Sequence, residues 1–314
     1  MQTDILISEV GPRDGLQSVN SMMATTDKQR WIDALVAAGV REIEVGSFVS
    51  PKLLPQMADT AQIVQHARQY PDVTVMALVP NSRGAQAAID AGAQKLTLPV
   101  SASELHSMAN VRKTRQEMLA EVANIVRLRD EQAPHIKVEV GLSTAFGCTL
   151  QGPVSEDDVV WLAERVVNAG ADEVGLSDTT GMANPAQVRR LFHRVRCMIG
   201  DKTGAAHMHN TRGLGLANCL AAHDAGVRTF DASQGGLGGC PYAPGASGNV
   251  VTEDLVFMFE AMGLVTGIDL DKLLAARESL RAGLPQEPLY GMTPEAGLPK
   301  GFVSTTTQRA HNHV

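Results

Sequence analysis

The chain has 314 residues, 44% of them hydrophobic, which is enough to bury a large core. Its formal net charge is −7 and it has no basic tract, so electrostatics gives no reason to expect nucleic acid or an anionic membrane as a partner. No apolar run approaches the roughly 20 residues of a membrane helix, and the N-terminus lacks a targeting pattern. The four cysteines are widely spaced without a CxxC pair, which predicts reduced thiols in a cytoplasmic protein.

Apolar runs of strand length alternate with segments of helical period, eight times along the chain. The predicted strands begin near Ile5, Glu42, Val73, Lys95, Lys137, Glu173, Gly204 and Thr229. Ala-Gly pairs mark the ends of four predicted helices, at Ala38-Gly39, Ala91-Gly92, Ala169-Gly170 and Ala225-Gly226. Eight such units predict an α/β protein with a closed (β/α)8 TIM barrel, whose active site lies at the carboxyl ends of the strands. An open doubly wound sheet is the alternative, disfavoured by the eighth unit and by polar residues at many strand ends.

A loop over residues 234–249 contains six glycines in sixteen residues, and helical patterns follow at 252–263 and 269–282. We expect residues 1–285 to form one catalytic barrel domain with additional C-terminal helices. The segment 286–314 contains several prolines and a Ser-Thr-Thr-Thr run, so we expect it to be irregular and partly disordered.

His207 and His209 are separated by one residue near the end of a predicted strand, so both imidazoles project from one face and can hold one cation. A buried, hydrogen-bonded pair of histidines is the alternative. Asp14, beside Arg13 at the end of the first strand, offers an oxygen ligand, although Pro, Asp and Gly also build ordinary surface turns. Two imidazoles with oxygen ligands suit a divalent cation, above all Mg²⁺ or Mn²⁺, with Zn²⁺ as the alternative.

Glu44 and Asp178 also stand at predicted strand ends, where a carboxylate can orient a ligand or cap the following loop. The pattern leaves both roles open. The glycine-rich segment 235–241 lacks the Lys-Ser/Thr of a P-loop. Its glycines suit a mobile lid that carries Cys240 over the barrel mouth, and the alternative is a flexible surface loop with an incidental cysteine.

Three segments, at residues 9–17, 47–52 and 236–249, resemble the 3-hydroxy-3-methylglutaryl-CoA lyase family, within the wider group of metal-dependent barrel lyases and Claisen-type synthases. The resemblance covers most of the chain. It implies that a divalent cation is surrounded by Asp14, His207, His209 and Asn249. It also implies roles for Arg13 at the thioester carbonyl, Glu44 in the active site and Cys240 as the lid thiol, and it places Gln17, Asp178 and Glu253 in or near the site. We expect Ser143, at the end of the fifth strand, to bind substrate together with Arg13, Gln17 and Asp178.

The reaction that follows from this resemblance is cleavage of 3-hydroxy-3-methylglutaryl-CoA, or a related 3-hydroxyacyl-CoA, to acetyl-CoA and a keto acid such as acetoacetate. In this hypothesis the cation acidifies the C3 hydroxyl, His207 accepts its proton, Arg13 stabilises the enolate oxygen and Cys240 or water protonates the enolate carbon. The resemblance also suggests a homodimer.

The chain departs from the family pattern on the fifth strand, where Glu139-Val140-Gly141 replaces Arg-Gly-Tyr, and after His209, where Asn210-Thr211-Arg212 replaces Asp-Thr-Tyr. These departures bear on the acyl group more than on the reaction type. The alternatives are a lyase for a different branched 3-hydroxyacyl-CoA and an aldolase or Claisen-type synthase of the same group. A non-catalytic binding barrel is disfavoured because Arg13, Asp14, both histidines, Asn249 and Cys240 occur together.

Overall fold

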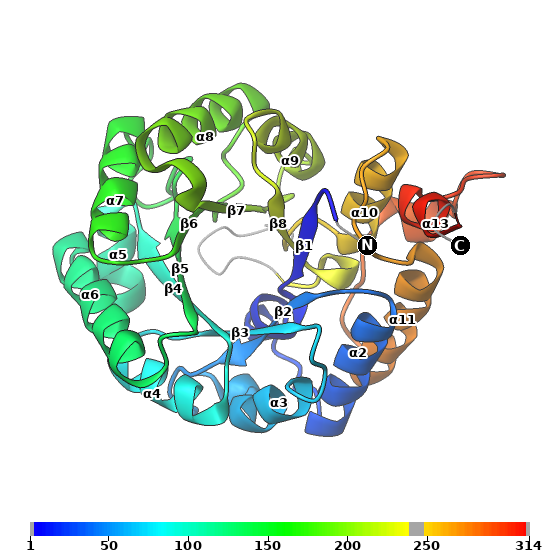
Figure 1. The fold of residues 1–314 in the computed structure, drawn as a ribbon, viewed down its shortest axis with the longest axis horizontal. Helices are drawn as coiled ribbons and strands as arrows, with labels where there is room; N and C mark the ends of the chain where they lie inside the picture. The colour runs from blue at the N-terminus through cyan, green and yellow to red at the C-terminus, as the bar shows by residue number, and fades with distance from the viewer. Residues whose placement is uncertain (1–2, 239–247, 312–314) are drawn as a thin grey trace.

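The computed structural model describes residues 3–238 and 248–311, which form a closed barrel ringed by helices (Figure 1). Eight parallel strands pair in chain order, and the last pairs with the first. The strands are β1 (Leu6–Glu9), β2 (Glu42–Ser47), β3 (Thr74–Leu78), β4 (Lys95–Ser101), β5 (Lys137–Ser143), β6 (Glu173–Asp178), β7 (Thr203–Met208) and β8 (Thr229–Ala232). Each begins within one residue of its predicted start, so the predicted (β/α)8 barrel is confirmed.

Helices follow the strands and form the outer ring of the barrel (Figure 1). The main barrel helices are α2 (Thr25–Ala37), α3 (Thr60–Ala67), α4 (Ser82–Ala91), α5 (Glu104–Val111), α6 (Arg115–Gln132), α7 (Glu156–Asn168), α8 (Pro185–Ile199) and α9 (Gly215–Asp224). Shorter turns are η1 (Gly11–Gly15), α1 (Leu16–Ser18), η2 (Pro55–Met57), η3 (Gly200–Lys202) and η4 (Gln234–Gly236). The glycines of the four Ala-Gly pairs all have φ between +95° and +104°, which explains why each of these helices ends there.

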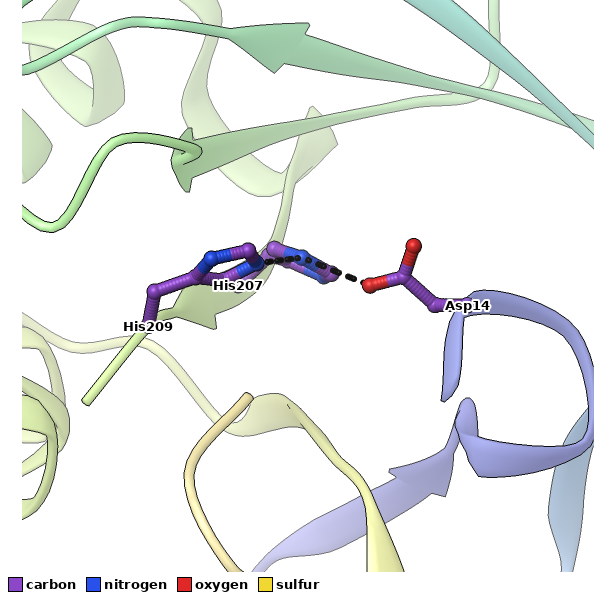
Figure 2. A group of neighbouring side chains, drawn as sticks. All are labelled: Asp14, His207 and His209. Atoms are coloured by element: carbon purple, nitrogen blue, oxygen red, sulfur yellow. Dashed lines mark hydrogen bonds and ion pairs between the residues drawn. The ribbon is translucent and has the colours of Figure 1, made fainter. Parts of the chain in front are cut away.

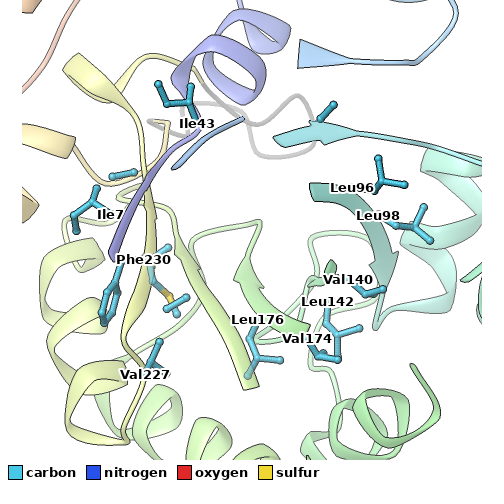
Figure 3. Packing of buried hydrophobic residues seen from close by; sticks show 14 of the residues in the cluster. Ile7, Ile43, Leu96, Leu98, Val140, Leu142, Val174, Leu176, Val227 and Phe230 are labelled. Atoms are coloured by element: carbon cyan, nitrogen blue, oxygen red, sulfur yellow. The ribbon is translucent and has the colours of Figure 1, made fainter. Parts of the chain in front are cut away.

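The strands separate an apolar outer face from an inner face that carries the polar residues. Buried side chains such as Leu96, Val140 and Leu176 lie between the strands and the surrounding helices (Figure 3). The residues that alternate with them, such as Thr97 and Ser177, line the cavity inside the barrel. Burial of the apolar face stabilises the fold and leaves the inner face free for chemistry.

The helices α10 (Thr252–Ala261) and α11 (Leu270–Gly283) match the two helical patterns after the glycine-rich loop, and α11 packs against α2 (Figure 1). The segment predicted to be irregular contains two short helices, α12 (Met292–Ala296) and α13 (Thr305–His311). Acidic side chains of α10 account for them, since Asp254 accepts the N–H groups of Met292 and Thr293, and Glu260 accepts that of Thr306. The domain boundary at residue 285 and the partial disorder beyond it stay predictions.

Within the described residues, no helix combines the length and apolar character required to cross a membrane.

One buried ion pair joins α10 and α11 to the base of the glycine-rich loop. Glu253 is 0% exposed and lies 2.6 Å from the Arg277 guanidinium. The same carboxylate accepts the N–H of Gly235, and Arg277 also donates to the carbonyl of Tyr290. Removing either partner would leave a charge without compensation in a dry environment.

We therefore expect Arg277→Met to destabilise the protein by about 3–5 kcal/mol, because it leaves the Glu253 carboxylate buried and unpaired. Arg281→Met, on the same helix, removes an arginine that is 57% exposed and paired only with exposed Glu278, so its cost should stay below about 0.5 kcal/mol. Urea unfolding of both variants measures the difference. Equal midpoints for the two would contradict the role given to the buried pair.

Candidate active site

Arg13 and Asp14 lie on a single π-helical turn, η1, directly after β1. Glu9, the last residue of β1, accepts the N–H groups of Gly11 and Gln234, both at 2.9 Å, and so fixes the entry to this turn. A Cβ at Gly11 would lie 2.6 Å from the Glu9 carboxylate, so only glycine fits. This wide turn directs two neighbouring charged side chains into the barrel, a use of π-turns that is frequent at functional sites.

The Arg13 guanidinium bridges two carboxylates. Its Nε donates to Glu44 at 2.6 Å and its Nη1 to Asp14 at 2.7 Å. Burial alone would raise the pKa of Asp14, but the charge of Arg13 and the nearby histidines hold that pKa well below its usual range. Burial raises the pKa of Glu44 despite its pairing with Arg13. Asp14 is therefore ionised at any physiological pH, as a cation ligand must be.

His207 and His209, at the end of β7, face the carboxylate of Asp14 (Figure 2). The Nε2 atom of His207 lies 3.2 Å from the Nε2 atom of His209 and 3.5 Å from a carboxylate oxygen of Asp14. One ligating atom from each of the three residues can be chosen so that all lie within 4.8 Å of one another. The structure thus contains a possible metal site built from the turn after β1 and the end of β7.

Asp231 on β8 makes the two histidines unequal. Its carboxylate lies 2.9 Å from Nδ1 of His207. Burial lowers the pKa of His207, but the hydrogen bond and charge of Asp231, together with Asp14, outweigh burial and raise it. Burial lowers the pKa of His209 to about 4, assisted by the charge of His207. Asp231 therefore fixes the His207 ring with Nε2 directed toward Asp14 and His209.

Two buried polar atoms beside this cluster have no hydrogen-bond partner among the described residues. They are Oδ1 of Asn249 and Nδ1 of His209. Asn249 forms an isolated β-bridge with His209 and donates its Nδ2 to Asp14 at 2.6 Å. A free amide oxygen, an ionised carboxylate and two facing imidazole nitrogens form a donor set that fits a divalent cation.

The cluster opens into a cavity of about 210 Å³ inside the barrel. Most of the residues predicted for the site line it, namely Arg13, Asp14, Gln17, Glu44, Ser143, His207 and His209. Asn249 joins the cluster through Asp14. The structure therefore brings together residues that lie more than 200 positions apart in the chain.

Among the described residues, Asp178 stands apart from this group. Asp178 was expected to contact substrate, but one of its oxygens accepts the N–H groups of Met182 and Ala183, and its side chain is not among those that line the cavity. It caps the turn before α8, which is the other role that its position allowed. Cys240 lies outside the described residues, so its role as a lid thiol stays a prediction.

Two polar partners inside the barrel were not predicted from the sequence. Asp231 orients His207, and the hydroxyl of Thr97 donates a hydrogen bond to Glu44. The signal for Asp231 was an acidic residue within an otherwise apolar strand, a position that is costly without a partner. Thr97 gave no comparable signal, because threonine is common in strands.

We expect the two histidines of the metal-free protein to titrate apart, His207 above and His209 below the ordinary value of about 6.5. Asp231→Asn should lower the pKa of His207, because it removes the charge that stabilises the imidazolium. Asp224→Asn, an exposed change at the end of α9, should leave both pKa values in place. NMR titration of the ring resonances in EDTA measures this, and a common titration of both rings would contradict the arrangement.

The family model described as HMGL-like matches residues 4–280. The hydroxymethylglutaryl-CoA lyase YngG of Bacillus subtilis is 41% identical over 272 residues, which cover 87% of this chain and 90% of that protein. The (R)-citramalyl-CoA lyase of Chloroflexus aurantiacus is also 41% identical, over 304 residues that cover 93% of this chain and 95% of that protein.

Solved structures agree with these relatives. An HMG-CoA lyase from Acinetobacter baumannii, in complex with coenzyme A and 3-methylmalate, has a TM-score of 0.89 and 41% identity, and the match covers 95% of this chain and 97% of that one. The carboxyl transferase domain of Rhizobium etli pyruvate carboxylase, with a TM-score of 0.69 and 18% identity, shares the fold alone. With the family model spanning most of its length, this chain belongs to the HMG-CoA lyase-like family of carbon–carbon lyases.

Proposed function

We propose that the protein cleaves 3-hydroxy-3-methylglutaryl-CoA, or a closely related 3-hydroxyacyl-CoA, to acetyl-CoA and a keto acid in a reaction that requires a divalent cation. The observation that carries the proposal is the convergence of Arg13 and Asp14 with His207 and His209 in one cavity. Relatives named as HMG-CoA lyases at 41% and 40% identity support the same reaction.

Four residues would hold the cation, namely Asp14, His207, His209 and Asn249. This mixed oxygen and nitrogen donor set favours Mg²⁺ or Mn²⁺, with Zn²⁺ as the alternative. When bound, such a cation supplies Lewis acidity that lowers the pKa of the substrate's C3 hydroxyl. No thiolate set accompanies the histidines among the described residues, which disfavours a closed structural zinc site.

The geometry favours a role for His207 other than the one expected from the sequence. Its Nδ1 is held by Asp231 and only its Nε2 faces the cluster, so the one ring nitrogen available cannot both bind a cation and accept the hydroxyl proton. We therefore assign His207 as a ligand of the cation. The proton acceptor is then one of two carboxylates, Glu44, which contacts Arg13, or Asp231, which contacts His207. This replaces the expectation that His207 is the base.

We assign Arg13 to stabilise the negative charge that develops on the thioester oxygen. When the C2–C3 bond breaks, C3 becomes the carbonyl carbon of the keto acid and C2 becomes part of a thioester enolate. A guanidinium fixed by two carboxylates, Asp14 and Glu44, needs little reorganisation to donate to the enolate oxygen. Protonation of C2, by water or by Cys240 as the sequence suggests, completes acetyl-CoA.

A citramalyl-CoA thioester is the second candidate substrate. Similarity to the (R)-citramalyl-CoA lyase extends over 304 residues, against 272 for YngG. Citramalyl-CoA carries its free carboxylate directly on C3, whereas 3-hydroxy-3-methylglutaryl-CoA carries it one methylene further away. Both would give acetyl-CoA, so only the keto acid, pyruvate or acetoacetate, distinguishes them.

The family resemblance supports a homodimer that acts on an acyl-CoA. The widely spaced cysteines support a cytoplasmic location. We propose all three. Analytical ultracentrifugation of the purified protein measures the first of these directly.

The test of function is incubation of the metal-loaded protein with each of the two thioesters, followed by identification of both products by mass spectrometry. We expect acetyl-CoA together with acetoacetate or pyruvate, and loss of both products in EDTA, with recovery on addition of Mn²⁺. No cleavage of either thioester by protein with a bound cation would contradict the proposal.

In the same assay, Arg13→Met should lower kcat by about 10²–10³-fold, because it removes the donor to the enolate oxygen. Arg189→Met removes an exposed arginine of α8 that pairs with Asp224, and it should keep wild-type kcat. Metal content and melting temperature of both variants show whether the site remains intact. Wild-type turnover by Arg13→Met would refute the role of this arginine.

A further inference from the structure

Gly141 lies on the inner face of β5, between Glu139 and Ser143, and all three residues line the cavity. A Cβ placed on Gly141 would meet only the Ser177 hydroxyl, at 3.8 Å, an ordinary contact distance. Its φ is not among the positive values of the chain, so the backbone does not require glycine. The missing side chain leaves open space in the wall of the cavity.

Two neighbouring glycines differ in this respect. A Cβ at Gly175 would lie 2.8 Å from the carbonyl oxygen of Ala205, and one at Gly204 would lie 3.2 Å from the backbone of Val174. The Glu139 carboxylate already occupies the room over both, at 3.2 and 3.3 Å from the same two Cβ positions. Packing therefore explains Gly175 and Gly204, and it does not explain Gly141.

The open space faces the reacting groups from across the barrel. In a closed barrel of eight strands paired in chain order, β5 is four strands away from β1, after which Arg13 and Asp14 lie. A 3-hydroxyacyl group with its hydroxyl at the Asp14 and histidine cluster and its thioester at Arg13 has its remaining C3 substituents directed away from both. In this orientation one of these substituents would point toward β5.

Charge decides which substituent enters. From Gly141 toward the amino-terminal ends of the strands, one lysine lies among three carboxylates. The Nζ atom of Lys95 is 2.7 Å from Glu139, 2.9 Å from Glu173 and 3.5 Å from Glu42. Because these three carboxylates already engage Lys95, this lysine is not available to pair with the free carboxylate of the substrate. Pro99, the register partner of Gly141 on β4, adds an apolar surface beside the open space. An uncharged branch fits this wall better than the free carboxylate.

We propose that the space over Gly141 receives the alkyl branch on C3, and that the protein therefore accepts 3-hydroxy-3-alkylacyl-CoA thioesters with branches longer than methyl. The inference rests on the proposed function, since it assigns a specificity-determining residue within that reaction. A pocket that gains or loses one methylene changes kcat/KM by about 10–200-fold, so a single side chain at this position can set the branch length.

The test compares 3-hydroxy-3-methylglutaryl-CoA with its 3-ethyl, 3-propyl and 3-butyl homologues in the wild type, Gly141→Ala and Gly141→Val. We expect the wild type to cleave the longer homologues, and Gly141→Val to lower kcat/KM for the butyl thioester at least about tenfold relative to the methyl one. Gly141→Ala should give an intermediate ratio. Because each ratio is taken within one variant, losses in folding or metal content cancel.

Leu142→Ile is the matched control, since this neighbouring residue is fully buried on the outer face of β5 and does not line the cavity. It should keep the wild-type ratio. If the wild type cleaves only the methyl thioester, or if Gly141→Val keeps the wild-type ratio, the inference is overturned while the proposed function stands. If the wild type cleaves none of the series and no citramalyl thioester, the proposed function fails and the inference fails with it.

Discussion

The site depends on the ion pair between two adjacent residues, Arg13 and Asp14. Side by side in the chain, such residues usually point in different directions, and the π-helical turn after β1 brings both into the barrel. Glu44 holds the other edge of the guanidinium, so Arg13 is fixed between its own turn and the interior of β2, where the sequence had predicted a strand end. This arrangement keeps Asp14 ionised and directs it toward the histidines of β7. In the proposed reaction, the cation ligand Asp14 and the oxyanion donor Arg13 are thus set in place before substrate arrives.

The two histidines gain different properties from their neighbours. His207 and His209 are two residues apart at the end of β7, so their side chains point to the same side. Only His207 contacts a carboxylate through its second ring nitrogen. His209 has no such partner among the described residues. Burial, assisted by the charge of His207, lowers its pKa and keeps the ring neutral and able to donate a lone pair. The neutral ring of His209 beside the oriented ring of His207 suits cation binding, because each can offer a ring nitrogen to the cation. Strand order supplies the orienting carboxylate, since β7 lies beside β8, which carries Asp231.

The sequence predicted the parts of the molecule that obey local rules. Strand starts followed from apolar periodicity, and helix ends followed from glycines such as Gly92 that adopt a left-handed conformation. The cation cluster followed from His207, His209 and Asp14 at strand ends. Asp231 could be inferred only once its strand was known to lie beside β7, and Asp178 could not be assigned because a cap and a ligand have the same sequence pattern. Helix α12 was missed because its N-terminal cap comes from Asp254, 38 residues away.

The central claim is that one divalent cation is held between the turn after β1 and the end of β7. The most direct measurement is the anomalous scattering of Mn²⁺ in crystals of the metal-loaded protein. We expect one strong peak, about 2.0–2.3 Å from ligand atoms of Asp14, His207 and His209. A peak elsewhere in the barrel, or an empty cluster in protein that binds Mn²⁺ in solution, would contradict it.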